Sequence, residues 1–263
     1  MAVTQLYETY VKTACAAGVD AIISGAGLPT ELPKFAEGYD VALAPIVSST
    51  KSANVILKFW DKKYHRTADF LVIEGPLAGG HLGFSREQLE DIPGLDYDTE
   101  IRNIITLKQT YEEKYQTAIP VFVAGGMFTA EDVKHVLELG ADGIQAATRF
   151  VATEECDASD AYKQAYVNAS EEDVIIIKSP VGMPGRAIKN AFIQRMLAAP
   201  DKISHCFNCL KACNPATAPY CITQALINAV VGDLDNGLIF CGSRVGEIRE
   251  ITTVPKLMQE LTV

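Results

Sequence analysis

Short apolar runs alternate with stretches of helical periodicity through about the first 150 residues. The runs place Ile, Val, Leu and Ala in succession, without a polar residue at every second position. Such runs predict strands that are buried on both faces, as in a parallel sheet covered by helices. Five strands are expected, at residues 20–26, 41–48, 69–75, 120–125 and 143–148.

The segments between these runs carry their apolar residues at helical spacing. Residues 52–64, 101–115 and 130–139 are predicted to be helices. Strands that alternate with helices predict an α/β fold with a parallel sheet and crossover helices. An eight-stranded barrel and an open doubly wound sheet both suit a chain of 263 residues.

The last third of the chain follows a different pattern. An apolar run at 174–177 is a candidate sixth strand, and the prolines and glycines of 180–185 are expected to interrupt regular structure after it. Residues 222–231 predict a short helix. We therefore expect a barrel-like domain at 1–155 and a C-terminal extension at 156–263 that packs on it.

The charge balance and the apolar profile exclude several classes of partner. The chain has 23 Lys and Arg against 33 Asp and Glu, and its net charge of -10 would repel a nucleic acid backbone. No apolar run approaches the roughly 20 residues that cross a bilayer, and the first residues lack the order of a signal peptide. A cytoplasmic protein with reduced cysteines and no membrane partner is expected.

Small residues follow two consecutive predicted strands. They are Gly125 and Gly126 after one strand, and Ala147 and Thr148 after the next. Ligands bind at the carboxyl ends of parallel strands, where small side chains leave backbone N–H groups open to an anion. The two turns therefore predict a phosphate site, although glycine also serves simply to permit tight turns.

A histidine lies in the most glycine-rich stretch, EGPLAGGHLG at residues 74–83. An imidazole with an ordinary pKa near 6.5 suits proton abstraction at neutral pH. His81 is therefore the candidate catalytic base. The alternative is a loop imidazole that only binds a backbone carbonyl.

Four cysteines lie within the segment 206–221, at Cys206, Cys209, Cys213 and Cys221. Four thiolates complete the ligand set of a [4Fe–4S] cluster or of a tetrahedral zinc ion. Free cysteine is also a common small core residue, so an ordered loop without metal is the alternative.

Four motifs occur in order along the chain: AGGHLG at 78–83, VAGG at 123–126, QAATRF at 145–150 and PVGMPGR at 180–186. Together they resemble the nitronate monooxygenase (2-nitropropane dioxygenase) family of FMN-dependent barrels, which includes the flavin-type enoyl-ACP reductases. The resemblance runs from about residue 5 to about residue 195.

The resemblance implies a TIM (β/α)8 barrel that binds FMN, with the flavin phosphate on Gly125, Gly126, Ala147 and Thr148. It implies further cofactor contacts at Glu74, Ala78, Gly79 and Gly80. In the monooxygenases, His81 would act as base on a nitroalkane or position the nitronate, and the alkyl nitronate is oxidised with O2. In the reductase branch, NAD(P)H would supply hydride to an enoyl thioester.

Two features depart from the family pattern. Ala147 stands where the family usually has glycine, and the first predicted strand corresponds to the fourth strand of the barrel. We therefore expect a truncated chain with an incomplete barrel of strands 4–8, whose open edges favour a homo-oligomer. The alternative hypothesis, from a different functional class, is that the chain is a catalytically silent partial barrel or a protein that binds a phosphate ligand.

Overall fold

The computed structural model describes residues 1–199, 202–209 and 213–262. These residues form two compact units. The first unit contains Met1–Gly75, Asp91–Ala124 and Lys134–Gln145. The second contains Pro76–Glu90, Gly125–Val133 and Ala146–Val263. The predicted boundary near residue 155 stays a prediction.

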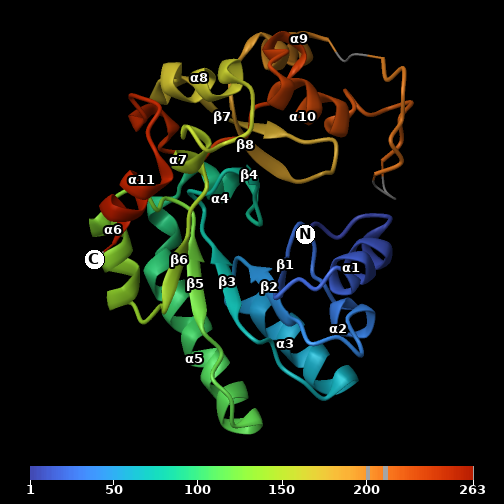
Figure 1. Ribbon diagram of the computed structural model, residues 1–263, viewed down its shortest axis with the longest axis vertical. Helices are drawn as coiled ribbons and strands as arrows, with labels where there is room; N and C mark the ends of the chain where they lie inside the picture. Colours follow the sequence, from blue (N-terminus) through green and yellow to red (C-terminus); the bar gives the residue numbers. More distant parts are fainter. Residues whose placement is uncertain (200–201, 210–212, 263) are drawn as a thin grey trace. The chain divides into compact units, whose positions relative to one another are not determined.

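A five-stranded parallel sheet forms the first unit (Figure 1). Its strand order is β1-β2-β3-β5-β6, and each strand pairs in parallel with its neighbours. The strands are β1 (Ala21–Ser24), β2 (Ala42–Val47), β3 (Leu71–Glu74), β5 (Val121–Ala124) and β6 (Gly143–Gln145). All five predicted strands are confirmed, and within the described residues this sheet does not close into a barrel.

The helices of this unit include the three that were predicted at residues 52–64, 101–115 and 130–139. They are α1 (Tyr7–Ala16), α2 (Leu32–Phe35), α3 (Thr50–Tyr64), α5 (Tyr97–Tyr115) and most of α6 (Ala130–Glu138), with the 3-10 turn η1 (Pro93–Leu95). Helix α3 begins at a capping box made by Ser49 and Ser52 and ends at His65, which has φ 52°. It packs against β2 and α5. The side chains that it buries are Ala53, Ile56, Leu57 and Trp60.

A three-stranded antiparallel sheet lies in the second unit (Figure 1). Its order is β4-β8-β7, from β4 (Gly80–His81), β8 (Pro184–Ile188) and β7 (Val174–Lys178). The candidate strand at 174–177 is confirmed, but it pairs with β8 outside the parallel sheet. The expectation that 180–185 interrupts regular structure is wrong from Pro184 onward. Pro180 and Gly182 instead form the hairpin turn, in which Gly182 donates its N–H to the carbonyl of Ser179.

Helices and apolar clusters complete the second unit. The helices are α4 (Arg86–Glu90), α7 (Thr148–Val151), α8 (Asp160–Asn168), α9 (Ala191–Ala198), α10 (Ile222–Val231) and α11 (Val254–Leu261), with 3-10 turns η2 (Glu171–Asp173), η3 (Leu234–Asn236) and η4 (Val245–Glu247). Helix α10 agrees with the predicted helix at 222–231. None of the described helices is both long and apolar enough to span a bilayer.

Candidate active site

His81 is fixed by the antiparallel sheet of the second unit. It lies on β4 opposite Gly185 of β8, and its Nε2 is 2.7 Å from Oγ of Ser179 at the end of β7. Its ring meets Phe240 edge to face, with 5.0 Å between the ring centroids. Burial lowers the pKa of His81 below its ordinary value, so the imidazole is neutral at pH 7. His81 therefore lies in paired backbone, whereas the sequence placed it in a loop.

Ser179 was not identified from the sequence, although it directly precedes the PVGMPGR motif. Only 3% of its surface is exposed. Its Oγ contacts His81 and also accepts the N–H of Val181 at 3.4 Å. The hairpin turn therefore presents this hydroxyl to the imidazole, a relation between residues 98 positions apart.

The glycine-rich stretch before His81 is packed against distant backbone. A Cβ added at Gly79 would lie 2.5 Å from the carbonyl carbon of Cys241, and Gly80 has φ 73°. The buried guanidinium of Arg186 donates to the carbonyl of Ala78. Close packing therefore requires glycine at 79, and the positive φ favours glycine at 80, independently of any ligand.

The two predicted phosphate turns both lie in the second unit. Gly125 and Gly126 have φ 93° and 85°, which side chains rarely adopt. A Cβ at Gly126 would lie 2.9 Å from Cδ1 of Leu77. Thr148 begins the short helix α7, and its Oγ1 accepts the N–H of Gly242 at 2.9 Å.

Glu74, the remaining predicted cofactor residue, ends β3 in the first unit. Its carboxyl group is largely buried, and desolvation raises its pKa to about 7. The Tyr97 hydroxyl donates to the backbone carbonyl of Glu74 at 2.9 Å. Glu74 therefore exchanges a proton near neutral pH, a property that the sequence did not indicate.

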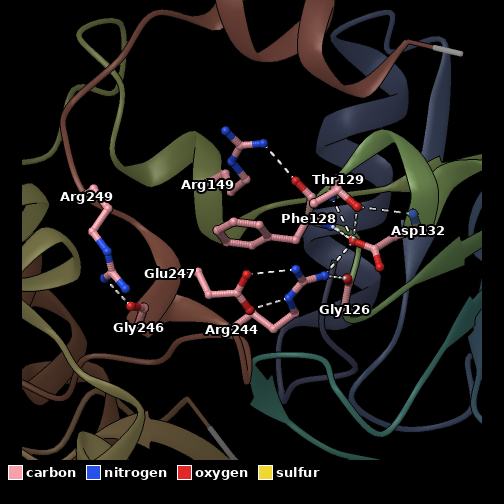
Figure 2. A network of polar contacts seen from close by, with 9 residues as sticks. All are labelled: Gly126, Phe128, Thr129, Asp132, Arg149, Arg244, Gly246, Glu247 and Arg249. Carbon is pink, nitrogen blue, oxygen red and sulfur yellow. Dashed lines mark hydrogen bonds and ion pairs between the residues drawn. The ribbon is translucent and has the colours of Figure 1, made fainter.

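Two arginines enclose the turn that follows Gly126 (Figure 2). The ring of Phe128 lies between the guanidinium groups of Arg149 and Arg244, whose Cζ atoms are 4.8 and 4.7 Å from its centroid. Arg149 also donates to the carbonyl of Phe128 at 2.7 Å. Arg244 forms ion pairs with Asp132 and Glu247. This cluster was not predicted from the sequence, because its members are separated by up to 119 positions.

The four cysteines of the segment 206–221 are free thiols that line one cavity of about 60 Å³. The neighbouring thiols contribute to a raised pKa of Cys213, after desolvation as the main cause. Among residues 1–199, 202–209 and 213–262, no group of three or more His, Cys, Asp or Glu is placed to hold a metal ion. The predicted [4Fe–4S] cluster or zinc ion therefore has no support from the described geometry.

The described residues form a parallel α/β sheet with glycine-rich turns after its strands, which is the arrangement found in TIM-barrel enzymes. A model of the nitronate monooxygenase family matches residues 1–263, and the chain belongs to that family. The family consists of flavin-dependent oxidoreductases. The resemblance seen in the sequence is confirmed.

Individual relatives agree with this assignment. A probable nitronate monooxygenase of Staphylococcus saprophyticus is 32% identical over 135 residues, which is 51% of this chain and 36% of that protein. FabK from Thermotoga maritima has a similar structure, with TM-score 0.74, 25% identity and coverage of 99% of this chain and 73% of that one. Nitroalkane oxidase from Streptomyces ansochromogenes shares the fold, with TM-score 0.66, 21% identity and coverage of 97% and 66%. The chain matches little more than a third of the length of the curated relative.

Proposed function

We propose that this chain is an FMN-dependent oxidoreductase that oxidises alkyl nitronates with O2 and uses His81 as its base. The observation that carries the proposal is the contact of 2.7 Å between His81 and Ser179, which orients a half-buried, neutral imidazole. A base must be unprotonated at working pH and held in one orientation, and this pair meets both needs.

The proposed role of His81 requires the tautomer in which Nε2 carries the proton, and the contact with Ser179 is compatible with it. Ser179 already accepts the N–H of Val181, and its Oγ can also accept an Nε2–H of the imidazole. In that tautomer, Nδ1 carries the lone pair and acts as the base. Proton transfer from the α-carbon of a neutral nitroalkane to Nδ1 would give the nitronate and an imidazolium, which would hold this anion by charge.

The second unit offers suitable residues for the FMN phosphate. Gly125, Gly126 and Ala147 present backbone N–H groups, and Thr148 adds a hydroxyl. The Oγ of Ser243 in this unit is buried and has no hydrogen-bond partner in the described chain, as expected for a donor that serves a ligand. Ala78, Gly79, Gly80 and Glu74 are proposed as further contacts. When bound, FMN supplies electron transfer with the substrate and the reaction with O2.

The test is oxygen consumption by the FMN-loaded protein with an alkyl nitronate. Nitronate-dependent oxygen uptake together with flavin absorbance would support the proposal. A colourless protein that FMN cannot convert to a yellow one would favour the silent or phosphate-binding reading.

A second candidate is NAD(P)H-dependent reduction of an enoyl thioester, the other activity that the sequence resemblance implies. The structural similarity to FabK over 99% of this chain supports this reductase activity as the second candidate. Oxidation of NADH with a crotonyl thioester, without nitronate-dependent oxygen uptake, would select this activity.

A further inference from the structure

The segment Cys241–Arg244 touches three turns of the second unit at once. The N–H of Ser243 donates to the carbonyl of Leu77 at 3.1 Å, and the N–H of Gly242 donates to Oγ1 of Thr148 at 2.9 Å. Arg244 Nη1 lies 3.5 Å from the carbonyl oxygen of Gly126. A segment near the C-terminal end is thus joined to the turns that contain the proposed phosphate ligands.

Close packing fixes the position of this segment. A Cβ added at Gly242 would lie 2.7 Å from Oγ1 of Thr148, so a side chain there would displace the threonine. Leu77 contacts both this segment and the Gly126 turn, because its carbonyl accepts the N–H of Ser243 and its side chain lies against Gly126. Ser243 therefore lies beside the same turns as Gly126 and Thr148.

Ser243 carries a hydroxyl that the fold leaves unsatisfied. Its Oγ is buried and has no hydrogen-bond partner within the described residues. A buried hydroxyl without a partner is costly, and most such groups in folded proteins are satisfied. The residue as a whole is half-buried, and rotation about its single χ1 bond moves the hydroxyl between three staggered positions.

Arg244, the residue after Ser243, is held by ion pairs with Asp132 and Glu247, and Figure 2 shows its contacts. Its Nη2 donates to Oε2 of Glu247 at 2.7 Å, and its Nη1 pairs with Oδ2 of Asp132. The same Asp132 oxygen accepts the N–H groups of Phe128 and Thr129 at 3.0 and 2.7 Å. Arg244 therefore connects the segment that carries Ser243 to the turn that follows Gly126.

We propose that the hydroxyl of Ser243 donates a hydrogen bond to the phosphate group of FMN. Arg244 is a positioning residue that keeps Ser243 next to the Gly125–Gly126 turn. This inference rests on the proposed function, because it assumes that FMN is the cofactor. The phosphate oxygens supply the strong acceptor that Ser243 lacks, and a hydrogen bond to a charged acceptor is stronger than one to a neutral acceptor.

The test compares FMN with riboflavin, which lacks the phosphate. Apoprotein is titrated with each flavin, and the dissociation constants are measured by quenching of flavin fluorescence. Ser243→Ala should weaken FMN binding about tenfold and leave riboflavin binding unchanged. Inorganic phosphate should compete with FMN more weakly in this variant than in the unmodified protein.

A matched control removes another buried hydroxyl without a partner. Thr67 Oγ1 has this property and lies in the first unit, so Thr67→Val should leave the affinities for both flavins unchanged. Arg244→Gln should weaken FMN binding while circular dichroism shows a folded chain, and Arg244→Lys should restore part of the loss. The phosphorus NMR resonance of bound FMN should shift in Ser243→Ala.

The outcomes separate the two proposals. Unchanged FMN affinity in Ser243→Ala, with FMN bound by the unmodified protein, overturns the role of Ser243 and leaves the proposed function standing. An equal loss for FMN and riboflavin also overturns it. Absence of FMN binding by the unmodified protein overturns both proposals.

Discussion

Nε2 of His81 lies 2.7 Å from Oγ of Ser179, which joins strand β4 to the end of β7 within one antiparallel sheet. Strand β8 lies between them and pairs with both. The imidazole is therefore positioned by regular backbone pairing as well as by its own hydrogen bond. Such support suits a base that must keep one orientation through turnover.

Replacement of His81 by alanine should lower the rate of nitroalkane oxidation by about two orders of magnitude, because proton abstraction from the nitroalkane by a positioned base contributes about that much or more. The assay is oxygen uptake with a neutral nitroalkane at saturating concentration. FMN affinity serves as the control and should remain within a few-fold of that of the unmodified protein. An unchanged rate would exclude His81 as the base.

Replacement of Ser179 by alanine should reduce kcat by about tenfold, because the imidazole loses the hydrogen-bond partner of its Nε2. Ser85→Ala is the matched control, since Ser85 is an exposed serine outside the β4-β8-β7 sheet. Both variants should keep the dissociation constant for FMN of the unmodified protein. Equal rates in the two variants would show that Ser179 does not act through His81.

The activity should fall only at a pH below the ordinary imidazole pKa of 6.5, because burial lowers the pKa of His81 and the base is lost when it is protonated. The free energy of unfolding should also fall as the pH drops. The folded pKa lies below the unfolded value near 6.5, so the unfolded chain binds more protons between the two values. The contribution of His81 to stability is therefore present above pH 6.5 and is lost as the pH falls. His81→Gln should remove this part of the pH dependence in urea unfolding.

Glu74 should have the opposite effect on stability. Its folded pKa of about 7 lies above the ordinary value of 4.5, so the folded chain holds the proton longer than the unfolded chain does. The favourable contribution is complete below pH 4.5 and is lost as the pH rises through 7, with a total of about 3 kcal/mol. Glu74→Gln should raise the free energy of unfolding at pH 8 and leave it nearly unchanged at pH 5. Urea unfolding at the two pH values measures this difference, and parallel curves for both proteins would contradict it.

Gly126→Ala should destabilise the chain more than Gly18→Ala. Both glycines have φ near 80°, so each substitution costs about 1–2 kcal/mol in backbone strain. Only Gly126 has a neighbour that the new methyl group would meet, at 2.9 Å in the side chain of Leu77, which adds about 1–3 kcal/mol. Thermal unfolding of the two variants checks the order. Equal losses would mean that Leu77 moves away without cost.

Local sequence signals were sufficient for the parallel sheet. The apolar runs before Ser24, Ser48 and Gly75 identify strands because such runs must be buried on both faces. The prolines and glycines of 180–185 led to the wrong prediction of an irregular segment, since a hairpin turn and an irregular loop use the same residues. The strand β8 is identified by its pairing with β7 and β4, which the local sequence does not contain.

The sequence by itself determined the α/β class, the family, and the candidacy of His81 and the small residues after two strands. These follow from short-range periodicity and from motifs that are contiguous in the chain. Only the tertiary structure brought Ser179 to His81, Arg244 to Gly126 and Gly242 to Thr148. Each of these pairs spans more than 90 positions, so it depends on how distant segments pack rather than on the order of neighbouring residues.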